Sequence, residues 1–338
     1  PTGLTVSPDG KHGAIAVVNA NEENNCYDSC LWLYDMADGS CRKLTSGKKE
    51  RNFIWLDGET ILFTSDREKR HEAGIKKGED WTSFYRISIH GGEAEFAFEL
   101  PYKVQKMKLA GNRLVMTVKY DYQKPDFAHM TEEEKREAYK SWEEEKDYEV
   151  FDELPFWANG QGIVNKKRTR LAVCDLETKE VCIVSPDYEN VEGFWVEGGD
   201  QVLYISNLYT DKKDVYQGLK LYTISSGKLE TIVEQKDMSI DYACILKGKV
   251  TFFGSYMKDY GFNENDKLYT VANGAVTLLS DYDDSIHDSI CCDCKFNDGA
   301  SAVHDENYIY FIATLRKQSV NRRFDAAGHM ETLVDRQG

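Results

Sequence analysis

The sequence predicts an all-β fold, a β-propeller built from four-stranded blades. A short turn rich in Gly, Asn or Asp recurs along the chain, followed each time by runs of β-forming residues. Each unit closes near a glycine, and the units follow one another at intervals of about 50 residues. Aromatic residues make up 12% of the chain, including 20 tyrosines, which suits strands with one hydrated face. A repeat of this length made of short strands is typical of propeller blades.

Two series of landmarks define the repeat. The turns that open the units are Pro8–Gly10, Leu56–Gly58, Ala110–Asn112, Glu197–Gly199, Lys247–Lys249 and Asp305–Asn307. The residues that close them are Gly39, Gly92, Lys179, Gly227, Gly274 and Gly328. They predict six blades with approximate bounds 1–47, 48–99, 100–186, 187–236, 237–283 and 284–338. Nothing in the sequence shows the closure of a first blade on a last one, so we expect the natural protein to continue into a seventh blade.

The first unit shows the strand pattern best. Ala14–Val18 predicts a buried strand, Leu31–Asp35 a second strand and Cys41–Thr45 a third. Short β-forming runs before the turns, such as Arg51–Trp55 and Gly193–Val196, predict an innermost strand. Each blade therefore has four strands. The same arrangement recurs in later units, with strands at Ile61–Arg67, Gln201–Ile205, Val250–Phe253 and Tyr308–Ile312.

The third unit is interrupted by an insert at residues 121–168. Its strand Leu114–Val118 finds its partner, Arg170–Asp175, only about fifty residues later in the chain. A long structured insert of this kind emerges from one face of a propeller and is typical of a lid or contact element.

One helix is predicted inside the insert, from Thr131 to Lys146. Thr131 is a good N-cap, and Glu134 stands three residues later, as a capping box requires. The apolar stripe consists only of Ala138, Tyr139 and Trp142, which predicts a surface helix.

The charge distribution excludes some partners. The formal net charge is −16, and residues 126–153 contribute −8 of it through twelve acidic and four basic side chains. Nucleic acid is a poor partner for such a surface, because phosphate binding needs a basic stripe. No apolar run approaches 18 residues, so we expect no membrane-spanning helix. The acidic run reads most simply as a solvated helix face, with a channel gate or partner contact as the alternative.

The nine cysteines favour a reducing, cytoplasmic setting. Their number is odd and their spacing suggests no disulfide scaffold. Cys26 and Cys30 are expected in a loop as ordinary thiols, with a loop disulfide in an exported protein as the alternative. The start of the sequence lacks an initiator Met and a signal-peptide pattern, so the native N-terminus is not visible and export stays open.

The sequence offers no catalytic residues. It has no Gly-x-Ser-x-Gly elbow, and Gly254-Ser255 is followed by Tyr256 and Met257 without the second glycine. The seven histidines fall mostly in expected loops or turns, so no Ser-His-acid triad can be nominated. No phosphate-binding glycine motif is present, so no cofactor is expected.

One cluster has the composition of a metal site. His287, Cys291, Cys292 and Cys294 combine an imidazole with soft sulfur ligands that suit zinc. The usual Cys-x-x-Cys knuckle is missing, however, and small buried residues in an inner strand explain the group better. No metal is therefore expected.

Two local groups are candidates for contact with a substrate. Arg67, at the end of a strand, could bind a carboxylate, although a turn locked by a charge-assisted hydrogen bond is the favoured interpretation. Phe156 and Trp157 stand near Asp152 and Glu153, and aromatics beside carboxylates could receive a peptide amine. Packing of the insert against its blade is the favoured interpretation.

These segments carry a family resemblance. Ser7–Lys11, Leu31–Asp35, Arg42–Thr45 and the run from Trp55 to Arg67 resemble the blade repeats of the prolyl oligopeptidase family, and its acylaminoacyl-peptidase branch most of all. The insert is similar to the third-blade insert of those enzymes, through Asp152–Phe156, Asn159–Gly162 and Arg170–Asp175. The resemblance covers nearly the whole chain. The blade pattern is shared with periplasmic TolB-type propellers, whereas the insert is more specific.

The resemblance implies a serine peptidase whose propeller covers an α/β-hydrolase domain. That domain would carry the Ser, Asp and His, and would begin beyond Gly338. This chain would then be inactive alone and would contribute substrate gating, because a propeller admits short peptides and excludes folded proteins. Its expected partners are the hydrolase domain and short peptide substrates, with an oligomer left open. Asp152, Glu153, Phe156, Trp157 and Arg67 are the candidates for gating.

The alternative is a stand-alone TolB-like or WD-type propeller that binds proteins or peptides. The gene beyond Gly338 discriminates the two hypotheses, because a Gly-x-Ser-x-Gly elbow there favours the peptidase and a stop codon favours the binding module. A propeller that hydrolyses sugars or lactones would need clustered carboxylates or metal ligands on its inner strands, and these strands begin with mostly apolar residues.

Overall fold

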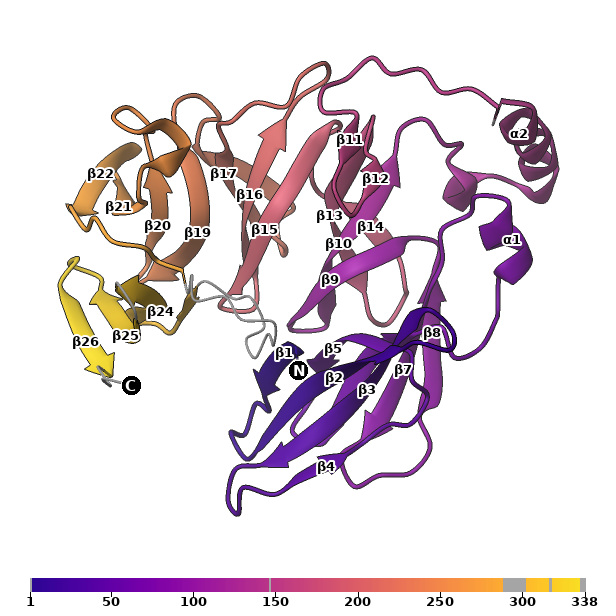
Figure 1. Cartoon of the computed structure of the whole chain (residues 1–338), viewed down its shortest axis with the longest axis horizontal. Coiled ribbons are helices and arrows are strands. Elements are labelled where there is room, and N and C mark those ends of the chain that lie inside the picture. The colour runs from indigo at the N-terminus through magenta and orange to yellow at the C-terminus, as the bar shows by residue number, and fades with distance from the viewer. Residues whose placement is uncertain (1, 146, 288–301, 316–317, 335–338) are drawn as a thin grey trace. The chain divides into compact units, whose positions relative to one another are not determined.

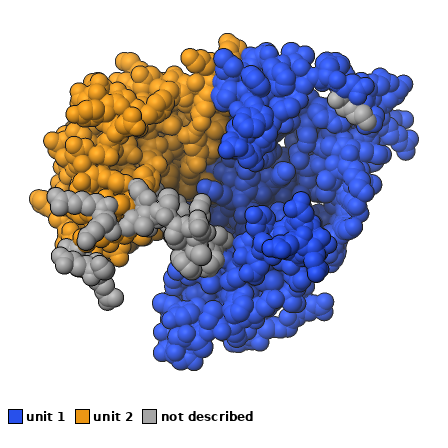
Figure 2. All heavy atoms as spheres, in the orientation of Figure 1, with its two compact units in different colours: residues 1–184, 296–298 blue, residues 185–295, 299–338 orange. Residues whose placement is uncertain are grey.

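The computed structural model describes residues 2–145, 147–287, 302–315 and 318–334, and these form six four-stranded antiparallel sheets (Figure 1). The all-β propeller prediction is confirmed, since each sheet is one blade and its strands follow one another in sheet order. The chain divides into two compact units. Unit 1 holds Pro1–Val184 and unit 2 begins at Ser185 (Figure 2). Blades 1 to 3 belong to unit 1 and blades 4 to 6 to unit 2.

The three blades of unit 1 have the following strands. Blade 1 consists of β1 (Thr2–Val6), β2 (His12–Asn21), β3 (Cys26–Asp35) and β4 (Cys41–Lys43). Blade 2 consists of β5 (Glu50–Trp55), β6 (Thr60–Ser65), β7 (Thr82–Ser88) and β8 (Glu95–Leu100). Blade 3 consists of β9 (Lys103–Ala110), β10 (Arg113–Asp121), β13 (Lys167–Asp175) and β14 (Val181–Ile183).

The three blades of unit 2 are continuous in sequence. Blade 4 consists of β15 (Glu189–Glu197), β16 (Gln201–Leu208), β17 (Gly218–Thr223) and β18 (Lys228–Val233). Blade 5 consists of β19 (Ser239–Leu246), β20 (Lys249–Ser255), β21 (Lys267–Ala272) and β22 (Ala275–Ser280). Blade 6 consists of β23 (Ala302–His304), β24 (Tyr308–Leu315), β25 (Gln318–Asp325) and β26 (Met330–Val334). A seventh blade stays a prediction.

Side-chain hydrogen bonds fix the turns that the sequence indicates. In the first turn, Gly10 adopts φ 72°, and Ser7 Oγ donates to Asp9 Oδ1 at 2.6 Å. In the second, Asp57 Oδ1 accepts from the backbone nitrogens of Glu59 and Thr60 at 2.8 and 2.7 Å. These carboxylates satisfy backbone donors that the tight turn leaves free, which is why Asp recurs there.

Within each unit, the hydrophobic core consists of layers between successive blades. In unit 1, one layer joins blade 2 to blade 3 through residues such as Phe84 and Met116, both fully buried. In unit 2, a layer between blades 5 and 6 is rich in aromatics, including Phe253 and Phe324. The strands that supply these layers carry long apolar runs because both of their faces are covered.

The insert of blade 3 contains most of the helical structure. Its elements are η1 (Phe127–His129), α2 (Glu132–Glu145), β11 (Trp157–Ala158) and β12 (Gly162–Ile163). The predicted helix is confirmed, including its capping box: Thr131 N donates to Glu134 Oε2 at 2.7 Å, and Glu134 N donates to Thr131 Oγ1 at 3.3 Å. No residue of α2 is buried, so the helix lies on the surface as expected. Two short helices, α1 (Glu72–Lys76) and η2 (Gly261–Asn263), lie outside the insert.

The capping box predicts a measurable contribution to stability. A Thr131→Ala variant loses the cap and is expected to lower the free energy of unfolding by about 1 kcal/mol, with reduced helical circular dichroism. Ser141→Ala, in the middle of the same helix, serves as the control and is expected to change stability by less than about 0.5 kcal/mol. Equal effects of the two substitutions would contradict the capping role.

The expectation of a loop around Cys26 and Cys30 is wrong. Both lie in β3, which pairs with β2 along its whole length, from His12 opposite Asp35 to Asn21 opposite Cys26. The four residue steps from Cys26 to Cys30 along the strand separate their Cα atoms by about 13 Å, which is far beyond disulfide reach. Both are free thiols. The predicted Cys291, Cys292 and Cys294 group lies outside the described residues.

Among the residues that the structure describes, no helix is long and apolar enough to cross a membrane.

Candidate functional site in the insert of blade 3

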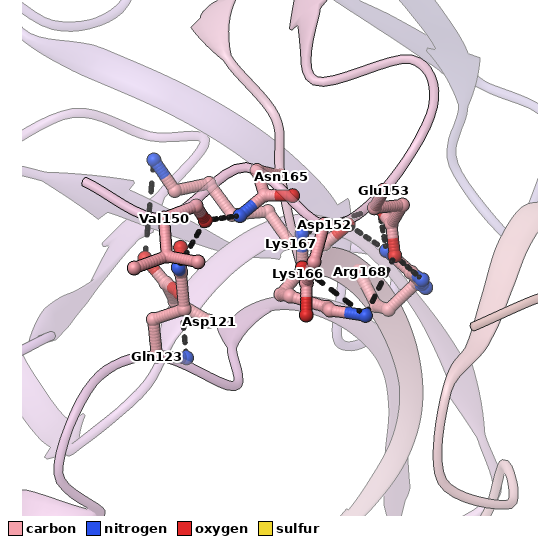
Figure 3. Close-up of polar contacts among 9 residues, drawn as sticks. All are labelled: Asp121, Gln123, Val150, Asp152, Glu153, Asn165, Lys166, Lys167 and Arg168. Atoms are coloured by element: carbon pink, nitrogen blue, oxygen red, sulfur yellow. Dashed lines mark hydrogen bonds and ion pairs between the residues drawn. The ribbon is translucent and has the colours of Figure 1, made fainter. Parts of the chain in front are cut away.

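The insert leaves and re-enters blade 3 at the same end of one β-hairpin. Strands β10 and β13 pair without interruption from Arg113 opposite Asp175 to Asp121 opposite Lys167. All insert residues therefore lie between two paired positions, and Figure 3 shows the polar contacts among residues that flank this junction.

A buried ion pair anchors the insert. The Glu153 and Arg168 side chains are both fully buried, and Arg168 Nη1 donates to Glu153 Oε1 at 3.0 Å while Nη2 contacts Oε2. The Lys166 backbone nitrogen also donates to Oε1, at 3.2 Å. Both oxygens of the Glu153 carboxylate are thus occupied by donors from β13 and the residue before it (Figure 3). Such a bidentate pair fixes both position and orientation.

A second set of contacts holds the chain on the other side of the anchor. Asn165 is fully buried, and its Nδ2 donates to the Val150 carbonyl oxygen at 2.8 Å. Gln123 Nε2 donates to the same oxygen at 3.4 Å. Lys167 Nζ lies 3.8 Å from Asp121 Oδ2. The segment 150–153 is therefore attached to β13 through Glu153 and, through the Val150 carbonyl, to residues that follow β10 and precede β13.

Around the buried Glu153–Arg168 pair, the same segment of the insert exposes a strip of side chains between Tyr148 and Trp157. Phe156 is 43% exposed and Trp157 55% exposed, and the Phe156 ring lies 4.9 Å from that of Phe151. Asp152 is also exposed and lies 3.4 Å from Lys166 Nζ. The expected packing of the insert against its blade is made by Glu153 beside β13, while Phe156 and Trp157 stay partly exposed. Further exposed apolar residues of the strip are Tyr148, Val150 and Leu154.

Arg67 is held within blade 2. Its Nη2 lies 2.6 Å from the fully buried Glu50 carboxylate, and its guanidinium group stacks over the rings of Phe63 and Tyr85 at 5.2 and 4.9 Å. The contact agrees with the favoured interpretation of Arg67, a charge-assisted hydrogen bond within the protein, and Glu50 is its partner. The structure thus brings Asp152, Glu153, Phe156 and Trp157 into one segment and places Arg67 elsewhere in unit 1. Their part in gating stays a prediction.

A cavity of about 120 Å³ lies where the start of the insert meets the segment after α1. Tyr139 of α2 approaches this region, with its hydroxyl bonded to Glu79 and its ring 5.1 Å from Phe127. Burial raises the pKa of the Asp121 carboxyl, against the opposing effect of a hydrogen bond from the Gln123 backbone. The lining includes Trp81, Tyr102, Asp121, Lys124 and Phe127. It can hold only a small group or a few water molecules.

Unit 2 contains a polar relay that sequence reasoning missed. His304 lies at the end of β23 rather than in a loop; its Nδ1 is 2.6 Å from Tyr242 Oη and its Nε2 is 3.0 Å from Glu197 Oε1. Burial raises the pKa of the Tyr242 hydroxyl far above its ordinary value. The relay ends on a phenol that keeps its proton, so it provides no activated nucleophile. Ser255 is buried and donates to Glu264 at 2.8 Å.

Arg168 is the important residue that the sequence analysis passed over. It shares one face of β13 with Arg170, Ala172 and Cys174, all of which are buried. An arginine on the same strand face as buried residues is itself expected to be buried, and a buried cation requires an acidic partner. The two-residue spacing of Arg168 from the buried positions of β13 was therefore the available signal. The acidic run before it was interpreted as solvated, so the pairing of Arg168 with Glu153 was not foreseen.

Comparison with known proteins places this geometry in context. No family model matches the chain. A stretch of 102 residues is 33% identical to an uncharacterised peptidase, YuxL, of Bacillus subtilis strain 168, and spans 30% of this chain and 14% of that protein. Among solved structures, the acylaminoacyl peptidase of Pyrococcus horikoshii superposes on 99% of this chain with a TM-score of 0.66 at 17% identity.

This chain has the fold of a peptidase propeller domain. The β-propeller domain of the Trilobed protease from Pyrococcus furiosus superposes on 98% of the chain, with a TM-score of 0.54 at 15% identity. The superposed residues make up 83% of the Trilobed protease propeller structure but only 45% of the Pyrococcus horikoshii peptidase. The peptidase propeller fold thus accounts for all six blades, while the chain spans less than half of the acylaminoacyl peptidase that it resembles.

Proposed function

We propose that this chain is the substrate-gating propeller domain of a serine peptidase of the acylaminoacyl-peptidase type, which hydrolyses short peptides. The observation that supports this most is the insert of blade 3, which stands on the buried Glu153–Arg168 pair and exposes Phe156, Trp157 and Asp152. A rigidly anchored strip of aromatics and acids is suited to contact an extended peptide with a free amine.

The catalytic Ser, Asp and His would belong to an α/β-hydrolase domain outside these 338 residues. The likeness to peptidase structures more than twice the length of this chain supports that arrangement. The compartment we propose is the cytoplasm, in keeping with the six described cysteines, which are all free thiols.

Peptidase assays test the proposal. The chain alone is expected not to hydrolyse peptide nitroanilides, whereas the natural full-length protein is expected to hydrolyse short peptides, to spare folded proteins and to react with a fluorophosphonate.

In the full-length protein, replacing both Phe156 and Trp157 by Ala is expected to raise KM about tenfold with kcat unchanged, because about 1–2 kcal/mol of aromatic contact is lost.

Tyr27→Ala provides the matched control, since Tyr27 is 71% exposed on blade 1 and makes no part of the strip. Turnover by the chain alone that survives Ser255→Ala would contradict the proposal. A full-length protein with no turnover that still binds peptides through Phe156 and Trp157 would favour the stand-alone binding propeller instead.

A further inference from the structure

One group of ligating side chains in unit 2 lies away from the insert. Asp241, Asp266 and His287 come from three separate segments, and their ligand atoms all lie within 4.8 Å of one another. His287 Nε2 is 3.6 Å from Asp241 Oδ2. Two ligands of a tetrahedral zinc ion, each about 2.1 Å from the metal, are about 3.4 Å apart. The spacing is therefore close to that of a coordination sphere.

The backbone holds each of the three side chains in place. Asp241 is the extra residue of a β-bulge, because β19 shifts register between Ile240 and Tyr242. A bulge re-aims its side chain, here toward His287. Asp266 directly precedes β21. The His287 backbone nitrogen donates a hydrogen bond to Ser285 Oγ at 3.0 Å, and the His287 carbonyl accepts one from Thr314 Oγ1 at 3.3 Å.

In the described part of the chain, no lysine or arginine forms an ion pair with Asp241 or Asp266. Among the residues that the structure describes, the Asp266 carboxylate forms no hydrogen bond and no ion pair. The adjacent Lys267 extends instead to Asp281, at 2.5 Å. A positive charge placed between a partly buried carboxylate and a second carboxylate would relieve their mutual repulsion.

The same position in blade 4 shows how the protein compensates a bulge acid elsewhere. There the register of β15 shifts between Val191 and Gly193, which makes Glu192 the bulged residue. Its carboxylate has a cation, Lys213 Nζ at 2.6 Å, and accepts a hydrogen bond from Gln217 Nε2 at 3.1 Å. In blade 5, a second acid and an imidazole take the place of these donors.

We propose that Asp241, Asp266 and His287 bind one divalent transition-metal ion, with zinc as the representative case. The two carboxylates and the imidazole supply three ligands, and water completes the coordination sphere. The imidazole favours zinc, cobalt or nickel over magnesium and calcium, which prefer oxygen ligands alone. The ion would cross-link blade 5 to the segment that follows it, because Asp241 and Asp266 belong to blade 5 and His287 comes after its last strand.

Calorimetric titration of the untagged, metal-free chain with zinc chloride tests the proposal. We expect one ion per chain and a higher thermal unfolding midpoint in zinc than in EDTA, whereas magnesium chloride should produce neither effect. Asp266→Asn and His287→Gln are each expected to weaken zinc binding at least about tenfold. His329→Gln is the matched control, because His329 also pairs with a carboxylate in unit 2, at 3.1 Å from Asp325, and is expected to retain full affinity.

Cobalt substitution separates this site from binding by cysteines. Nitrogen and oxygen ligands give Co²⁺ only weak visible bands, whereas thiolate ligands add an intense near-ultraviolet charge-transfer band. A charge-transfer band, or stoichiometric binding that Asp266→Asn and His287→Gln leave unchanged, would overturn the proposal, as would no binding at all. Asp241→Asn, at an exposed position, is the second variant, and circular dichroism in EDTA verifies that each variant is folded.

Discussion

A Glu153→Gln variant is expected to lower the free energy of unfolding by about 3–5 kcal/mol. The substitution removes the carboxylate charge and leaves the Arg168 guanidinium group fully buried without its counter-ion. The cost is large because a buried guanidinium group that loses a bidentate carboxylate partner cannot replace that charge with water. Urea unfolding at neutral pH, followed by circular dichroism, measures the difference.

Two further variants make this result specific. Asp152→Asn changes the adjacent acid, which is itself exposed in its ion pair with Lys166, and is expected to cost less than about 0.5 kcal/mol. Replacing both Glu153 and Arg168 by Met is expected to recover much of the lost stability, since no unpaired charge remains. If Glu153→Gln and Asp152→Asn had equal effects, Glu153 would not be the anchor of the insert.

A Phe324→Ala variant is expected to cost about 3–5 kcal/mol of unfolding free energy. Phe324 is fully buried between blades 5 and 6, where its ring stacks on Phe311 at 5.4 Å and meets the edge of Tyr282 at 5.5 Å. Removing the ring leaves a cavity that these rigid neighbours cannot fill. The same denaturation experiment measures the effect.

The size of the side chain, rather than its aromatic character alone, accounts for most of this expected loss. Phe324→Leu keeps much of the volume and is expected to cost clearly less than the alanine variant. Phe262→Ala is the control in the same unit, because Phe262 is 76% exposed and its removal should change stability by less than about 0.5 kcal/mol. A small effect of Phe324→Ala would mean that the layer between the blades repacks.

The blade strands and the insert helix could be predicted because their signals are local. Apolar runs between turn residues located strands such as β10 and β16, and the Thr131–Glu134 capping box located α2. The ends of β2 and β3 could not be predicted in the same way. There the hairpin continues through polar residues to Asn21 opposite Cys26, since backbone pairing at an exposed tip requires no apolar side chain.

The site was harder to predict because its contacts depend on tertiary structure. Asp152, Glu153, Phe156 and Trp157 were identified as one segment, but the buried role of Glu153 depends on Arg168, which reaches it only after β13 pairs with β10. His287 was grouped with the cysteines that follow it in sequence. Its described neighbour is Asp241, which a distant strand brings to it. Sequence proximity was informative within an element and misleading between elements.

The unbroken pairing of β10 with β13 also bears on how such proteins diversify. Asp121 and Lys167 face each other as the last pair of the ladder, so the two ends of the insert lie only about 5 Å apart. A short turn could close the same hairpin without moving a strand. The backbone of the blade is consequently independent of the insert, and selection can exchange or lengthen the insert as long as the buried Arg168 of β13 keeps an acidic partner or is replaced with it.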